Sequence, residues 1–271
     1  MGHVKRYLPG TPCWTDLATP DPAGAKAFYT ALFGWAASDT PMGPDMVYTM
    51  LLKDGRRAAA LFPMDPGSHG GAPPHWQTYI SVADVEAASA RAAELGATLV
   101  VEPVEVEGAG RMAAIQDPSG AHLQLWQPGQ HIGCEVVNEP GALIWNELVT
   151  RDVAAARAFY EALFGWQPQV DARGYVSYLN AVGEERVYAG GLFPMPDEYP
   201  PHVPSHWIPY FAVADVEAAR ARVETLGGTA ITEVMDISAG RFCVAADPQG
   251  AAFYLFENPS GETGPSSDTL A

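Results

Sequence analysis

The chain contains one long sequence twice. Trp14–Trp35 reads WTDLATPDPAGAKAFYTALFGW and Trp145–Trp166 reads WNELVTRDVAAARAFYEALFGW, with fourteen of the 22 positions identical and an offset of 131 residues. A second pair of segments, His75–Ala88 and His206–Ala219, repeats at the same offset. Solenoid repeats are much shorter, about 20–50 residues. The long period therefore predicts two homologous globular domains in tandem.

The domain boundaries follow from the composition along the chain. We predict a first domain over residues 10–127 and a second domain over residues 141–258. The Gly- and Pro-rich residues 128–140 are interpreted as a linker, residues 64–74 as a weaker one, and the Ser-, Gly- and Pro-rich residues 259–271 as a flexible tail. With 271 residues, of which 48% are hydrophobic, the chain is long and apolar enough to bury two cores.

The formal net charge of −17 argues against the basic surface that nucleic-acid binding requires. Two interpretations of the acidic excess stay open: it keeps the protein soluble, or it raises the local concentration of cationic small molecules. No apolar run reaches the roughly 18 residues that span a bilayer. The first residues, MGHVKRYLPG, lack the apolar stretch of a secretory signal. We therefore expect neither a nucleic-acid partner nor a membrane.

The cysteines carry no recognisable chemistry. Cys13, Cys134 and Cys243 are spread along the chain without a CxxC pair, so they indicate neither a disulfide framework nor a zinc knuckle. Free cysteines fit a reducing cytoplasm. The chain also lacks a GxGxxG or GxxxxGK[ST] phosphate loop and a GxSxG elbow, which argues against nucleotide cofactors and the usual serine hydrolases. No cofactor is expected.

Four segments share one pattern that predicts a helix. Each begins at an Asp, whose side chain accepts the free N–H groups of a first helical turn, and ends at a Gly suited to the left-handed cap. The segments are Asp21–Gly34, Asp84–Gly96, Asp152–Gly165 and Asp215–Gly227. A short strand precedes each helix and hairpin signals follow it, such as Asp54–Gly55 between two apolar runs. The chain is thus a strand–helix–strand–strand–strand (βαβββ) unit used four times.

These segments resemble the vicinal oxygen chelate superfamily, which includes glyoxalases, bleomycin resistance proteins and extradiol dioxygenases. The resemblance rests on Trp-x-Asp/Glu-Leu-x-Thr-x-Asp…Ala-Phe-Tyr-x-Ala-Leu-Phe-Gly-Trp, on His-Trp…Val-Ala-Asp-Val-Glu-Ala-Ala and on Asp-Pro-x-Gly, all present in both halves. In detail the chain is similar to the tandem-domain actinobacterial branch labelled glyoxalase-like or hydroxylase-like. This implies an α+β fold of tandem vicinal-oxygen-chelate domains, each built from two βαβββ modules that form a cup-shaped mixed sheet.

The resemblance also implies where metal ligands would fall, on the first and last strands of the units. These positions hold Trp14, Asp16, His75, Gln77, His122, Gln124 and Trp126 in the first half, and Trp145, Glu147, His206, Ile208, Ala252 and Tyr254 in the second. Divalent transition metals need converging imidazole, thiolate or carboxylate groups. The usual carboxylate position holds Gln124 and Tyr254, so we expect no metal. One alternative stays open: Asp16, His75 and His122 form a two-His-one-carboxylate set if all face inward.

Indole and phenol rings at these positions are suited to stacking on a planar ligand. We therefore predict a metal-independent protein that binds a hydrophobic, aromatic metabolite or antibiotic; a cationic one would suit the net charge. By resemblance to bleomycin resistance proteins, its role is sequestration or an accessory role beside a biosynthetic enzyme. The candidate ligand-binding residues are Trp14, Asp16, His75, Gln124, Trp126, Trp145, Glu147, His206 and Tyr254. For the two repeated tryptophans, filling of the cup is an equal alternative.

An enzyme is the competing hypothesis. It is either a metal-dependent lyase, isomerase or oxygenase that uses Asp16, His75 and His122, or a cofactor-free catalyst with Glu147 as base and Tyr254 as acid. In a third alternative, one half is only a scaffold. Two further matched residues, Arg111 and Arg241, either bind an anionic group or are solvated or edge-strand side chains.

Overall fold

A computed structural model describes residues 2–44, 46–64, 72–171 and 174–258. The predicted βαβββ unit occurs four times. The first domain consists of β2 (Pro12–Thr19), α1 (Pro22–Phe33), β3 (Ala36–Pro41), β4 (Val47–Lys53), β5 (Arg56–Pro63), β6 (His75–Ser81), α2 (Val85–Glu94), β7 (Thr98–Val106), β8 (Gly110–Gln116) and β9 (His122–Pro128). The second consists of β11 (Leu143–Thr150), α3 (Val153–Phe164), β12 (Gln167–Val170), β13 (Val176–Val182), β14 (Glu185–Pro194), β15 (His206–Ala212), α4 (Val216–Thr225), β16 (Thr229–Ala230), β17 (Met235–Ile237), β18 (Gly240–Ala246) and β19 (Ala252–Glu257).

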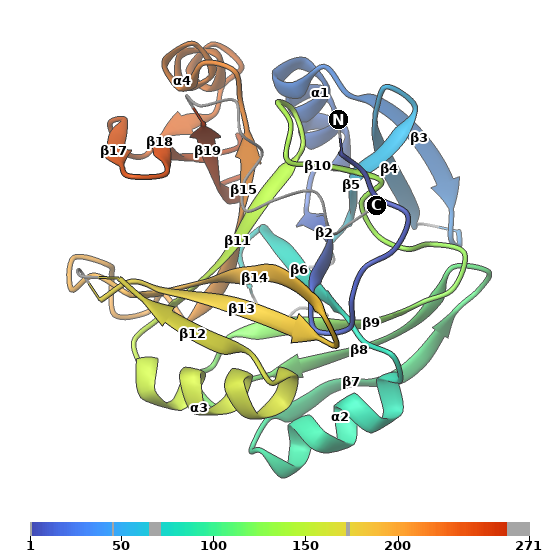
Figure 1. The fold of residues 1–271 in the computed structure, drawn as a ribbon. Helices are drawn as coiled ribbons and strands as arrows, with labels where there is room; N and C mark the ends of the chain where they lie inside the picture. Colours follow the sequence, from blue (N-terminus) through green and yellow to red (C-terminus); the bar gives the residue numbers. More distant parts are fainter. Residues whose placement is uncertain (1, 45, 65–71, 172–173, 259–271) are drawn as a thin grey trace.

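Each domain is built around one mixed sheet. The strand order is β3-β4-β5-β2-β6-β9-β8-β7 in the first sheet and β12-β13-β14-β11-β15-β19-β18-β16 in the second. The first strands of the paired units, β2 with β6 and β11 with β15, are antiparallel and join the two units into one sheet. The outer strands of the first sheet lie on the right of Figure 1 and those of the second on the left. The predicted α+β class with two mixed sheets in tandem is confirmed. We refer to the interior faces of these sheets as the first cup and the second cup.

The predicted helix caps are present. All four Asp residues that precede the helices accept a hydrogen bond from the backbone N–H three residues later, at 2.9–3.0 Å. Gly34 and Gly165 end α1 and α3 in the left-handed conformation, with φ of 71° and 68°. In α2 and α4 a leucine is the cap residue, and the left-handed glycine follows one position later. The sequence pattern therefore locates these helix ends to within one residue.

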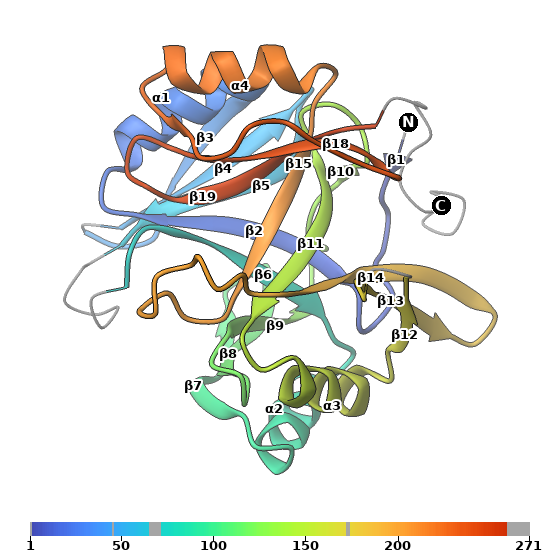
Figure 2. The ribbon, with the colours of Figure 1, turned by 90° about the vertical axis from the view of Figure 1, so that its left-hand side faces the viewer.

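The two domains pack helix against helix. Helix α1 of the first domain lies beside α4 of the second, and α2 lies beside α3, as Figures 1 and 2 both show. The hydroxyl of Tyr29 on α1 donates to Asp247 of the second domain at 3.1 Å. In the reciprocal contact, Tyr160 on α3 donates to Asp117 of the first domain at 2.7 Å. The repeated Phe-Tyr and Asp-Pro-x-Gly motifs therefore join the two domains, besides shaping each one.

A hydrophobic core crosses the domain boundary on each side of the molecule. On one side Phe28 of α1 lies 6.3 Å, ring to ring, from Phe253 of β19, and both side chains are buried. On the other side Phe159 and Tyr160 of α3 belong to the same cluster as Ile115 and Leu123 of the first sheet. Burial of apolar surface is the main favourable term in folding. The two domains therefore stabilise each other through shared cores.

The segment interpreted as a linker, residues 128–140, packs against the rest of the protein. Within it, β10 (Val136–Val137) pairs with β1 (Gly2–His3) and with β11. Cys134 is fully buried, and its backbone N–H donates to the carbonyl of Cys13 at 2.7 Å. Most of the weaker linker, residues 64–74, and the tail, residues 259–271, lie outside the described residues. Of the helices that the structure describes, none is long and apolar enough to cross a membrane.

Candidate functional site

Each cup contains a buried carboxyl group that two tyrosines hold. In the first cup, Oδ2 of Asp16 on β2 accepts hydrogen bonds from the hydroxyls of Tyr48 on β4 and Tyr79 on β6, both at 2.9 Å. In the second cup, Oε1 of Glu147 on β11 accepts a hydrogen bond from Tyr210 of β15 at 2.9 Å. Tyr175 also hydrogen-bonds to Glu147. The same constellation thus occurs twice.

A tryptophan extends each constellation. Trp14 lies two residues before Asp16 on β2, hence on the same face of the sheet, and its Nε1 donates to Tyr48 at 3.1 Å. In the second cup Trp145 donates to Tyr175 at 3.0 Å. The first network is Trp14, Asp16, Tyr48 and Tyr79, and the second network is Trp145, Glu147, Tyr175 and Tyr210.

Burial sets the proton affinity of both carboxyls. Removal from water disfavours the charged form and raises the pKa of Asp16 to about 7, although the hydrogen bonds from Tyr79 and Tyr48 oppose the shift. The pKa of Glu147 is also raised to about 7 by burial, against the hydrogen bonds from Tyr210 and Tyr175. Near neutral pH, each group can therefore exist with or without its proton, which suits it to proton exchange or to binding a cation.

The raised pKa values predict that stability falls as the pH rises. In the unfolded chain Asp16 titrates near its ordinary value of 3.8 and Glu147 near 4.5, so below about 7 the folded state retains protons that the unfolded state has released. As the pH rises from the pKa of the unfolded state to that of the folded state, the unfolded state becomes more favourable relative to the folded state. The loss of stability is complete above about pH 7. We expect the free energy of unfolding to fall by roughly 3 kcal/mol per carboxyl between about pH 5 and about pH 8.

Urea unfolding at several pH values measures this effect. Asp16→Asn and Glu147→Gln imitate the protonated carboxyls, so each variant should show a flatter pH dependence than the unmodified protein. An unchanged slope in both variants would show that the two carboxyls titrate normally in the folded state.

Sequence reasoning found the carboxyls and tryptophans of the networks but missed the tyrosines. Tyr79 and Tyr210 had a visible signal, because they occur at the same place in the second repeated segment and share a strand face with Gln77 and Ile208. The other two tyrosines are not at the repeat offset, so no signal in the sequence pairs them.

The remaining candidates of the first cup lie around its network. Gln124 and Trp126 are buried on β9, where Gln124 pairs with Tyr79 of β6. His131 comes from the segment interpreted as a linker. Its ring lies 4.5 Å from that of Trp14 and 5.6 Å from that of Trp126, while its carbonyl accepts from Trp126 at 2.8 Å. No pattern in the sequence predicts a linker residue at this place.

The predicted base and acid of the second cup are separated. Glu147 is hydrogen-bonded to Tyr210 and Tyr175, whereas Tyr254 stacks on Tyr210 with ring centroids 4.1 Å apart and planes at 3°. Tyr254 hydrogen-bonds to Tyr199. Tyr210 therefore contacts both groups, and among the described contacts no hydrogen bond joins Glu147 to Tyr254 directly. The roles of Glu147 as base and Tyr254 as acid stay a prediction.

The three histidines of the prediction are held at strand starts. Nδ1 of His75 lies 2.8 Å from the carbonyl of Pro73, and Nδ1 of His206 lies 2.9 Å from that of Pro204. His122 is exposed at the start of β9. In the described part of the chain, no three His, Cys, Asp or Glu side chains come together as a metal-binding group. The alternative ligand set of Asp16, His75 and His122 is therefore not assembled.

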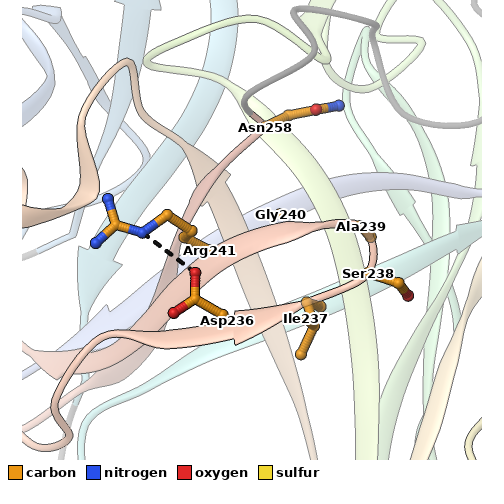
Figure 3. Close-up of a pocket in the computed structure, with 7 residues that line it drawn as sticks. All are labelled: Asp236, Ile237, Ser238, Ala239, Gly240, Arg241 and Asn258. Atoms are coloured by element: carbon orange, nitrogen blue, oxygen red, sulfur yellow. Dashed lines mark ion pairs between the residues drawn. The ribbon is translucent and has the colours of Figure 1, made fainter.

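The matched arginines are occupied by carboxylates. Arg241 lines a shallow pocket at the β17–β18 turn (Figure 3), where it contacts Asp236 at 3.5 Å, Glu217 at 3.0 Å and Glu257 at 3.5 Å. Arg111 is likewise paired, with Glu86 and Glu105. These partners neutralise both guanidinium groups, which argues against an anion site. The edge-strand alternative is wrong, because β8 lies between β9 and β7, and β18 lies between β19 and β16.

Two family models match the chain. Residues 11–125 match the Glyoxalase/Bleomycin resistance protein/Dioxygenase superfamily, and residues 146–256 match a Glyoxalase-like domain. The chain belongs to this superfamily. The protein provisionally named glyoxylase CFP32 from Mycobacterium tuberculosis (strain CDC 1551 / Oshkosh) is 45% identical over 261 residues, which cover 95% of this chain and 98% of the relative.

Two further proteins extend the comparison. The anthracycline biosynthesis protein DnrV of Streptomyces peucetius is 35% identical over 273 residues, covering 95% of this chain and 97% of the relative. Among solved structures, the Mn(II)-bound glyoxalase of Novosphingobium aromaticivorans superposes with a TM-score of 0.64 at 12% identity, over 92% of this chain and 82% of that chain. At that identity the structural match shows the fold alone.

The first and last strands of each cup of this superfamily member offer one carboxyl group as a ligand for a divalent metal. On the first and last strands of the first cup, Gln77 and Gln124 accompany Asp16, and in the second cup Ile208 and Tyr254 accompany Glu147. Alkyl and neutral phenol side chains are poor ligands for transition metals, and an amide oxygen suits only harder ions such as Mn²⁺. Oδ2 of Asp16 accepts hydrogen bonds from two tyrosines, and Glu147 is likewise hydrogen-bonded to two.

Proposed function

We propose that this protein binds a planar, largely apolar small molecule in its cups without a metal. The observation that carries the proposal is the pair of buried networks, in which one carboxyl, two tyrosines and a tryptophan occupy the interior face of each sheet. Small-molecule sites combine aromatic and apolar walls with a few placed polar groups. In the first cup the half-buried Tyr48, Met50, Phe62 and Met112 supply such a wall.

The relatives support a polycyclic aromatic ligand. DnrV is named for anthracycline biosynthesis, and this chain aligns with it over nearly its whole length. We therefore propose sequestration of an aromatic metabolite or antibiotic, or an accessory role beside a biosynthetic enzyme. We place this role in the reducing cytoplasm, because the three cysteines are buried and unpaired.

Tryptophan fluorescence tests the proposal. Titration with polycyclic aromatic natural products should quench the emission and saturate at one or two ligands per chain. Because the indole contributes stacking and buried area, Trp14→Ala or Trp145→Ala should weaken binding by more than about tenfold in the cup that works. Four tryptophans between the domains give a constant background: Trp35, Trp76, Trp166 and Trp207. A broad panel that gives no quenching would contradict the proposal.

Proton-transfer catalysis is the second candidate function. It is favoured by the raised pKa of about 7 of Asp16 and Glu147, which matches a general base or acid working at neutral pH. Turnover of a carbonyl, epoxide or catechol substrate that disappears in Asp16→Asn or Glu147→Gln would promote this candidate above binding.

A further inference from the structure

We infer that the first cup is the working one, and that its ligand presents a protonated amine to two buried acceptor oxygens, Oδ1 of Asp16 and Oε1 of Gln124. This inference rests on the proposed binding function and adds to it the chemistry of the ligand and the half that holds it. Asp16 is 1% exposed and Gln124 is 6% exposed. Among the described residues neither oxygen has a hydrogen-bond partner. Buried polar atoms in native proteins are nearly always hydrogen-bonded. Two buried oxygens without a hydrogen-bond donor in one cup therefore indicate that a ligand supplies the donors.

The two oxygens belong to side chains on the same face of the sheet. Asp16 lies on β2 and Gln124 on β9, with β6 between them. Tyr79 of β6 connects them, because it pairs with Gln124 in the sheet and donates its hydroxyl to the other oxygen of Asp16. Tyr79 therefore holds the Asp16 carboxyl by one oxygen and leaves the second available to a ligand.

The second cup differs at these positions. Tyr254 stands where the first cup has Gln124, and its ring stacks on Tyr210, which itself donates to Glu147. Within the described residues, no oxygen of Glu147, Tyr254 or Tyr210 is buried without a partner. Among these residues the second cup therefore has no fully buried oxygen without a partner, whereas the first cup has two.

The two oxygens without partners determine which chemical group the ligand must present. Both vacant atoms are acceptors, so the ligand must bring donors. An ammonium group has three donors and a charge, and a hydrogen bond between an ammonium and a carboxylate is stronger than one between neutral groups. The net charge of −17 also raises the concentration of cations around the protein.

Binding of an ammonium should displace the proton of Asp16. In the free cup burial holds the pKa of Asp16 at about 7, and a cation at Oδ1 would lower it. The titratable groups that face Asp16 are Tyr48 and Tyr79, which stay protonated because burial raises their pKa values further. Burial lowers the pKa of His131, which contacts Trp14, to about 4, so it stays neutral near pH 7. About half a proton should therefore leave per ligand bound at pH 7, and fewer at higher pH.

The experiment compares three anthracene probes: one with a primary aminomethyl group, its N-acetyl derivative and the methyl analogue without a donor. Calorimetric titration in two buffers of different ionisation enthalpy measures both affinity and proton release. We expect the amine to bind at least about tenfold more tightly than the other two. It alone should release protons.

Variants locate the site. Asp16→Asn and Gln124→Leu should each weaken binding of the amine at least about tenfold more than binding of the methyl analogue, with thermal unfolding showing that each variant is folded. Glu102→Gln on the exposed surface of β7 controls for the loss of one negative charge. Equal binding of all three probes, or an amine preference abolished by Glu147→Gln and not by Asp16→Asn, would overturn the inference while binding itself stands. If none of the probes binds and the broad panel gives no quenching, the proposed function fails as well.

Discussion

Replacing Phe28 by alanine should lower the free energy of unfolding by about 3–5 kcal/mol, and Phe159→Ala should do the same. The two side chains are 3% and 2% exposed. Phe28 packs edge-on against Tyr29 at 4.9 Å and against Phe253 of the other domain at 6.3 Å. Removal of the ring leaves a cavity in a core that both domains share.

Chemical denaturation measures the effect. Val100→Ala on the exposed edge strand β7 is a matched apolar truncation, because Val100 is 50% exposed, and should change stability by less than about 0.5 kcal/mol. Near-neutral unfolding of both phenylalanine variants would contradict the shared-core arrangement of the helices.

Replacing Asp117 or Asp247 by alanine should cost about 3–5 kcal/mol, because each buried carboxyl satisfies several donors at once. Oδ1 of Asp117 accepts from the backbone N–H groups of Ser119 at 2.8 Å and Ala121 at 3.0 Å, while Oδ2 accepts from Tyr160 at 2.7 Å. Without the carboxyl, the turn before β9 and the tyrosine of the other domain both lose their acceptor. Asp247 makes the equivalent contacts, with Tyr29 as the partner across the domains.

Tyrosine variants separate the two parts of this effect. Tyr160→Phe and Tyr29→Phe remove only the hydrogen bond between the domains and should cost about 1–3 kcal/mol. Unfolding midpoints and slopes in urea give both values. If the tyrosine variants lower the free energy of unfolding as much as the aspartate variants, the turn contacts contribute nothing to stability. If the tyrosine variants leave it unchanged, the hydrogen bond between the domains is dispensable.

Both predictions concern contacts between the two domains that position the cups. The central strands β2 and β11 carry the carboxyls of the networks, and their neighbours β6 and β15 carry Trp76 and Trp207, which donate to Tyr29 and Tyr160. The same tyrosines bond to the aspartates across the domains. A change at the domain boundary should therefore reach the strands that carry the binding residues.

The sequence by itself determined the repeat, the four units and the ends of the helices. Those features depend on residues close together in the chain: an Asp at the start of a helix, a Gly at its end, an Asp-Gly between two apolar strands. It also placed Asp16 and Glu147, with their tryptophans, on one face of a first strand, because side chains on a strand alternate between faces. The superfamily resemblance supplied the cup shape, which no local pattern contains.

Only the tertiary structure decided how the site is completed. Tyr48 reaches its carboxyl from β4, two positions from β2 in the sheet, and Tyr175 reaches its carboxyl from the residue before β13, two positions from β11. The units differ in loop length, so the positions of the two tyrosines in the chain do not correspond. His131 enters the first cup from a segment whose composition is that of a linker. The raised pKa values of the two carboxyls arise from burial by all of these neighbours together. Local patterns fix local geometry, whereas contacts between distant strands depend on register and packing, and the chemistry of this site depends on those contacts.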